Sequence, residues 1–200
     1  MAVGDKQRLI TEIVGSVLGQ KPELDKSFEW FINKHIKEHF GVYYPLIDEI
    51  FCSLNGDKEA NLNKGKKSLE CDAYFGGKSN FIFEFDEVQH FSSARLQTLN
   101  LYPKDLKVNF KIDDWKNYCQ TNKIIADKYR KAKTTKDFSF VGGRTAQRAY
   151  LDCFRDLLPQ QHGLNPTLRI SEFEVEDLFI NNKETCIKIE NLIKIKLTFQ

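Results

Sequence analysis

The sequence predicts an α/β fold, because segments with helical periodicity flank one regular pair of β-strand patterns. Apolar residues recur at helical spacing near the amino terminus and again in the second half of the chain, while residues 68–90 alternate apolar and polar side chains around a glycine turn. A chain of 200 residues, 41% of them hydrophobic, can bury one sizeable core. We therefore expect a single α/β domain over residues 1–200.

Helices are predicted first along the chain. Leucine, isoleucine and valine recur at helical spacing over residues 5–19, and Gly19 followed by Pro22 ends the pattern. A second helix is expected over residues 28–40, where aromatic and aliphatic side chains share one face. Residues 44–54 are a candidate third helix.

A polar stretch without periodicity, NGDKEANLNKGKK, predicts a mobile surface loop over about residues 55–67. The most regular β pattern follows it. SLECDAYF and NFIFEFDEVQHF read as two strands, about residues 68–75 and 80–90, separated by the glycine turn. These two strands predict a β-hairpin.

The second half of the chain is expected to add helices and a strand. Residues 115–132 and 146–158 have helical character, and the second of these segments follows the Gly142–Gly143 pair. LRISEFEV, residues 168–175, indicates a late strand. The tail from Lys183 onward mixes apolar and basic residues and is compatible with either a helix or a strand.

Composition argues against export and membrane insertion. The amino terminus has no apolar run behind a basic start, and no stretch approaches the roughly 18 apolar residues that span a bilayer. Five cysteines at wide spacing form no CxxC pair, a pattern typical of reduced thiols in a cytosolic protein. We expect a cytoplasmic protein without a membrane partner.

The formal net charge of +2 does not by itself indicate a nucleic-acid partner, but its distribution is uneven. Residues 123–148 carry eight lysines and arginines against two aspartates. Five of these cations are candidate phosphate contacts: Arg130, Lys131, Lys133, Arg144 and Arg148. Arg155 continues the helical face of the last two. A solvated face with intrahelical pairs to Asp152 and Asp156 explains much of the same pattern, so both interpretations stay open.

The hairpin register follows from the length of its turn. A three-residue loop over residues 77–79 would pair Phe75 with Phe81 and Ala73 with Phe83, which gathers apolar side chains on one face. A two-residue loop would shift the register and reverse which side chains share a face.

In the three-residue register, the other face of the hairpin is acidic. Asp72 opposes Glu84, and Glu70 opposes Asp86. Opposed side chains lie about 5 Å apart at Cβ, where like charges destabilise a sheet. A bound cation, lysine or arginine partners, or exposure to water would relieve the repulsion. Simple alternation of acidic and apolar residues on a half-exposed strand is the plainer interpretation.

A divalent metal suits this acidic face best among the three. Mg²⁺ takes oxygen ligands from one or two acidic residues and keeps several waters. We expect Asp72, Glu84 and Asp86 to bind Mg²⁺ or Mn²⁺. A water bound to such a metal is more acidic and can attack a phosphodiester.

The run ECDAYF, a glycine turn and NFIFEFDEVQHF resembles the core hairpin of the PD-(D/E)XK nuclease superfamily. In that superfamily an aspartate on one strand and an acidic-x-Lys on the next hold a divalent metal, and Asp72 and Glu84 match the acidic positions. Asp86 stands where the lysine is expected. This departure is similar to the branch containing very short patch repair endonucleases, in which a strand ending in an acidic residue is soon followed by a histidine, here His90. The resemblance covers residues 70–91.

The resemblance implies a restriction-endonuclease-like fold with a central mixed sheet, and an endonuclease of restriction or repair type acting on DNA. It implies a metal held by Asp72, Glu84 and Asp86, with His90 as a proton donor or acceptor. Members often add a glutamate from an early helix, for which Glu29 is the best match. A homodimer would suit an enzyme that cuts two strands, although no motif indicates one.

Two alternatives stay open. Glu87-Val88-Gln89 could supply an acidic-x-Gln motif, but period two places Glu87 and Gln89 on the face of Phe85 unless a bulge intervenes. The missing lysine also allows a catalytically inactive nuclease-like module that binds DNA or a protein. An interaction protein whose acidic face binds a basic partner is a third hypothesis.

Overall fold

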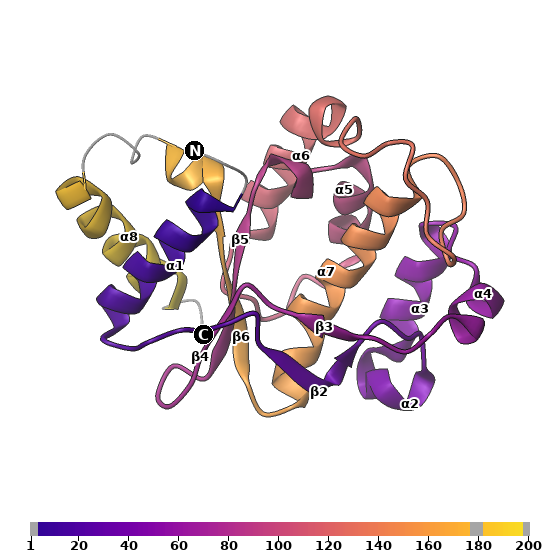
Figure 1. The fold of residues 1–200 in the computed structure, drawn as a ribbon, viewed down its shortest axis with the longest axis horizontal. Helices are drawn as coiled ribbons and strands as arrows, with labels where there is room; N and C mark the ends of the chain where they lie inside the picture. Colours follow the sequence, from indigo (N-terminus) through magenta and orange to yellow (C-terminus); the bar gives the residue numbers. More distant parts are fainter. Residues whose placement is uncertain (1–3, 177–181, 198–200) are drawn as a thin grey trace.

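The computed structural model describes residues 4–176 and 182–197 and has a mixed α/β architecture with one central sheet (Figure 1). The sheet contains, in spatial order, β1 (Glu23–Leu24), β4 (Ala73–Phe75), β5 (Phe81–Asp86) and β6 (Asn165–Ser171). The pairs β1–β4 and β4–β5 are antiparallel, whereas β6 runs parallel to β5. The predicted α/β class and the mixed sheet are confirmed.

Helices cover both faces of this sheet (Figure 1). On one face, α1 (Asp5–Leu18) and α8 (Asn182–Leu197) pack against the phenylalanines of β5. On the other face lies α7 (Gly143–Gln161), supported by α5 (Ser93–Leu101), α6 (Ile112–Ala126) and α3 (Tyr44–Ser53). Because successive strand residues point to opposite faces, the alternate residues of β5, including Glu84, face α7. None of the described helices is long and apolar enough to cross a membrane.

The predicted hairpin register is confirmed. Ala73 pairs with Phe83 and Phe75 with Phe81, and the turn is the expected three-residue loop over residues 77–79. Gly77 adopts a φ of 57°, a left-handed conformation that a glycine tolerates without strain.

The strands of the hairpin are shorter than predicted. Residues 68–70 form a separate strand, β3 (Ser68–Glu70), which pairs with β2 (Ser27–Ile32) in a second, two-stranded sheet. Glu70 is therefore opposite Ser27, and the prediction that it opposes Asp86 was wrong. After Asp86 the chain enters a 3₁₀ turn, Val88–His90.

The helix predicted over residues 28–40 was also wrong. Its first half is β2, in which Phe28 and Trp30 are partly buried while Glu29 between them is exposed. Aromatic side chains favour strands because they pack well on a pleated surface, and here they outweigh the helical spacing. The helical part is α2 (Lys37–Phe40), followed by a 3₁₀ turn over Gly41–Tyr43.

The segment predicted as a loop over residues 55–67 contains a short helix, α4 (Lys58–Asn63). Asp57 caps this helix by accepting a hydrogen bond from the Ala60 amide at 2.9 Å. A buried ion pair between Lys64 and Asp137 fastens the segment to the turn before α7. In the second half of the chain, α6 ends at Ala126 rather than at residue 132, and the late strand β6 is followed by a 3₁₀ turn over Glu172–Glu174.

Candidate active site

The acidic residues predicted to bind metal meet beneath α7. Glu84 and Asp86 project from β5 with 3% and 1% of their surface exposed, so water does not screen their charges. Asp72 lies in the bend before β4 and contacts the neighbouring strand. Its amide is 3.4 Å from Oε1 of Glu84, and its Oδ2 accepts a hydrogen bond from the Phe85 amide at 2.8 Å. The hairpin therefore brings Asp72 and Glu84 together as its register predicts.

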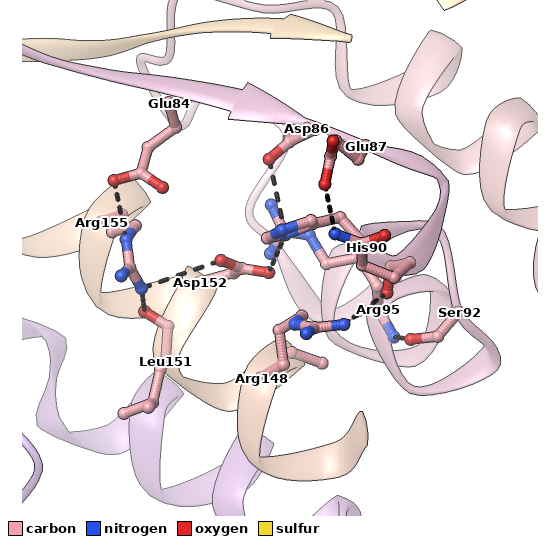
Figure 2. Close-up of polar contacts among 12 residues, drawn as sticks. Glu84, Asp86, Glu87, His90, Ser92, Arg95, Arg148, Leu151, Asp152 and Arg155 are labelled. Carbon is pink, nitrogen blue, oxygen red and sulfur yellow. Dashed lines mark hydrogen bonds and ion pairs between the residues drawn. The ribbon is translucent and has the colours of Figure 1, made fainter. Parts of the chain in front are cut away.

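Arginines compensate the two buried carboxylates of β5. Nε of Arg155, on α7, lies 2.8 Å from Oε1 of Glu84 (Figure 2). Nη1 of Arg169, on β6, lies 2.7 Å from Oδ1 of Asp86, and the indole of Trp115 donates to Oδ2 of the same carboxylate at 2.7 Å. Of the three ways to relieve the repulsion, this structure uses arginine partners.

His90 joins the same group from the 3₁₀ turn after β5. Its Nδ1 lies 3.2 Å from Oδ2 of Asp152 and 3.6 Å from Oδ1 of Asp86 (Figure 2). Burial raises the pKa of Asp152, but His90 and Arg169 outweigh burial and hold that pKa well below its usual range. The histidine is thus fixed between an aspartate of β5 and an aspartate of α7.

At Asp72 and Glu84 the effect of burial is not outweighed, so the pKa of each is raised. Burial raises the pKa of Asp72 to about 6, against the hydrogen bond from the Phe85 amide. It raises the pKa of Glu84 to about 8, although Arg155 favours the ionised form. Buried carboxylates with raised pKa values are common where a protein performs proton or metal chemistry.

A second layer of buried charge supports the site. Asp156 of α7 accepts from Arg169 and from Arg95, each at 2.7 Å, and from the Tyr102 hydroxyl at 2.6 Å. The intrahelical pair expected for Asp152 is present, because Nη1 of Arg155 lies 3.8 Å from Oδ1 of Asp152. Asp156 instead binds arginines outside its helix, and the sequence pattern did not predict the role of Arg169. An arginine flanked by Leu168 and Ile170 in a predicted strand is the feature that could have revealed it, because arginine is rarely buried unless it is paired.

The chemistry of the acidic site fits a small divalent cation through two ligands. Oδ1 of Asp72 and Oε2 of Glu84 form no hydrogen bond with any described residue, whereas both oxygens of Asp86 are used. Mg²⁺ is commonly bound through one or two carboxylates, with waters and phosphate completing its shell. Within residues 4–176 and 182–197, no group of three or more His, Cys, Asp or Glu residues is arranged to hold a metal.

Three of the predicted phosphate-binding cations lie close to one another, and one of them, Arg148, contacts the residue before His90. The guanidinium groups of Arg130 and Arg148 each lie 5.2 Å from the centre of the Tyr129 ring, and Nη1 of Arg148 donates to the carbonyl of Gln89 at 3.1 Å. Burial, followed by repulsion from Arg148 and Arg130, lowers the pKa of Arg144. Arg130, Arg144 and Arg148 together form the arginine cluster. In the described part of the chain, none of the three forms an ion pair with a carboxylate.

The two predicted lysines lie in the chain segment beside the arginine cluster. The Lys133 amide donates to the Arg130 carbonyl at 2.8 Å, and the Lys133 carbonyl accepts from the Arg144 amide at 3.1 Å. Lys131 lines a separate cavity of about 340 Å³ together with Phe140 and Val141, and Lys133 is exposed. Glu29 is exposed on β2 rather than on an early helix, so the helical origin expected for it was wrong.

The alternative motif is not on the strand either. Glu87 follows the end of β5, and its Oε2 accepts a hydrogen bond from Nε2 of Gln89 at 2.6 Å.

One comparison with known protein families found a match to part of the chain. The model of a family of unknown function (DUF7255) matches residues 49–134, which include the acidic hairpin and His90 but neither α7 nor β6. No curated protein and no solved structure matches the chain.

Proposed function

We propose that this chain is a metal-dependent endonuclease that hydrolyses phosphodiester bonds in DNA, of restriction or repair type. The observation that carries the proposal is the meeting of Asp72 and Glu84 from two neighbouring strands, each with a carboxylate oxygen left without a partner among the described residues. This is the pair of acidic positions that the resemblance to the PD-(D/E)XK superfamily implies.

Each neighbouring group has a role in such a reaction. Asp72 and Glu84 would hold Mg²⁺, which supplies a Lewis acid and a more acidic water. Arg155 places a positive charge beside Glu84. This charge would take the place of the motif lysine, because β5 has Asp86 at the position where the resemblance leads one to expect that lysine. His90, oriented by Asp152, can donate or accept a proton. The arginine cluster would contact phosphate oxygens.

Cleavage of supercoiled plasmid with Mg²⁺ or with EDTA tests the proposal. Asp72→Asn and Glu84→Gln keep the shape of each side chain and remove its negative charge, so both variants should lose metal-dependent nicking. Glu59→Gln, which changes an exposed glutamate on α4, is the matched control and should cut like the wild type. A folded wild-type protein that leaves every DNA substrate intact would contradict the nuclease assignment.

The arginine pairs favour a second candidate function, a catalytically inactive nuclease-like module that binds DNA. Arg155 and Arg169 already neutralise Glu84 and Asp86 without a metal. Metal binding at Glu84 would have to compete with Arg155. DNA binding that is insensitive to Mg²⁺, with no cleavage, would support this second candidate.

A further inference from the structure

A groove of about 560 Å³ runs along the edge of α7, away from the carboxylates of the candidate site. One wall is α7 itself, through Arg144 and Leu151. The opposite wall is the segment 64–69, which leads into β3, and Lys136 lines the groove from the turn before α7.

The lining of the groove carries uncompensated positive charge. Asp137, its acidic member, is buried and pairs with Lys64, and it also accepts hydrogen bonds from Asn61 and Thr135. Lys67 and Lys136 are exposed, and Arg144 bonds to the side-chain amide oxygen of Gln147. Within the described residues these last three cations form no ion pair with a carboxylate.

Arg155 connects the groove to the candidate active site. Its Nη1 donates to the carbonyl of Leu151, at the inner end of the groove, and its Nη2 donates to the carbonyl of Glu70 on β3 at 2.8 Å. Both walls are therefore tied together by the same guanidinium that binds Glu84 (Figure 2 shows its contacts on the α7 side). A linear ligand that lay in the groove would have its inner end next to Glu84.

We infer that this groove holds one strand of nucleic acid through its phosphates and directs that strand toward Glu84. The inference rests on the proposed function, because it names the path of the substrate to the same site. A nucleic-acid strand carries one negative charge per phosphate, and grooves that follow such a backbone are lined with cations. Cations on both walls can contact successive phosphates of a single strand.

Fluorescence anisotropy with 5′-fluorescein-labelled (dT)12 in EDTA tests the groove without cleavage. The variant Lys67→Glu/Lys136→Glu changes two exposed side chains and should retain the wild-type circular dichroism spectrum. We expect its affinity for the oligonucleotide to fall by about tenfold or more, and the salt slope of binding to decrease by about one for each lysine. The matched control, Lys104→Glu/Lys107→Glu, lies in a different hollow beside Asp105 and should bind within about twofold of the wild type.

Other outcomes overturn the groove assignment. Equal losses in the two double variants would mean that net charge alone drives binding. Polyglutamate and unlabelled (dT)12 can be compared as competitors of the labelled oligonucleotide on the wild-type protein. If polyglutamate displaces it as effectively as (dT)12 does, the groove binds an acidic protein partner. If Lys67→Glu/Lys136→Glu binds (dT)12 with unchanged affinity, the assignment of the groove as a strand-binding site is wrong, even if the wild type cleaves plasmid. Lost affinity supports the groove even if no plasmid is cut, so the groove and the nuclease proposal fail separately.

Discussion

The guanidinium of Arg155 binds the carboxylate of Glu84 at 2.8 Å, although 71 residues separate them in the chain. The contact joins α7 to the middle of the sheet and leaves Arg155 partly buried with its charge compensated. A buried pair of this kind is expensive to break, because loss of one partner leaves the other uncompensated.

Removal of Arg155 should therefore destabilise the protein in a pH-dependent manner. Burial already raises the pKa of Glu84 to about 8 from an ordinary value of 4.5. The contribution of this group to stability is therefore complete below pH 4.5 and is lost as the pH rises to about 8, because Glu84 must then ionise in a buried position. Arg155→Met should raise the pKa further and lower the free energy of unfolding by about 3–5 kcal/mol at pH 9, and by less at pH 6. Urea denaturation at both pH values measures this difference. Arg148→Met, which removes an arginine without a carboxylate partner, should show no such pH dependence.

Metal affinity should increase with pH if Asp72 and Glu84 are the ligands. Both side chains must lose their protons to coordinate a cation, and burial holds their pKa values at about 6 and about 8. We expect Mn²⁺ affinity, measured by isothermal titration calorimetry, to rise from pH 6 to pH 8.5 with release of protons to the buffer. Asp72→Asn should abolish the binding. Affinity that is flat over this range would rule out these two ligands.

Asp156 should contribute more to stability than any surface ion pair. It is buried against Arg95 and Arg169, and its replacement by alanine leaves both cations without that partner. We expect Asp156→Ala to cost about 3–5 kcal/mol in urea denaturation. Glu190→Ala, which breaks the exposed Lys194–Glu190 pair on α8, is the control and should cost less than about 0.5 kcal/mol. Similar costs for both variants would contradict the supporting role assigned to Asp156.

The arginine cluster should oppose stability while it favours DNA binding. Burial, followed by repulsion from Arg148 and Arg130, lowers the pKa of Arg144, so Arg144→Gln should stabilise the fold by about 0.5 kcal/mol at low salt. The gain should shrink in 0.5 M NaCl, because salt screens the repulsion. Thermal denaturation at two salt concentrations, together with oligonucleotide affinity, would reveal both effects. A loss of stability at low salt would mean that the bond to Gln147 matters more than the repulsion.

His90 offers a test of proton transfer that is separate from metal binding. If it donates or accepts a proton, His90→Ala should lower the cleavage rate by about 10²-fold or more while leaving Mn²⁺ affinity within about threefold. His162→Ala, which changes an exposed histidine at the end of α7, should leave cleavage unchanged. Equal loss of metal affinity and cleavage in His90→Ala would indicate a structural role instead.

Local features of the fold were predictable because short-range patterns determine them. The three-residue turn set the pairing of Phe75 with Phe81, and the same register brought Asp72 to Glu84. The strand at Ser27–Ile32 was missed because its aromatic spacing also fits a helix, and its partner strand β3 follows much later in the chain.

The charge network of the candidate site could not be predicted for a different reason. Asp86 binds Arg169 across 83 residues, and Asp156 binds Arg95 across 61. Periodicity reports which face of an element is apolar, but it does not report which distant element covers that face. The acidic face for which a bound metal was expected is therefore a buried ionic layer, compensated by arginines of α7 and β6.

The burial of Arg169 also fixes the alignment of the two parallel strands. Arg169 is opposite Glu84 in the β5–β6 ladder, while its neighbours Leu168 and Ile170 pack on the phenylalanine side. A slip of one residue would place the guanidinium among aromatic rings and leave Asp86 without its cation. The acidic hairpin precedes Arg155 and Arg169 in the chain, so its carboxylates have no arginine partners until both of these residues have been synthesised. The site is therefore assembled late, and a truncated chain would hold the acidic residues without the arginines that order them.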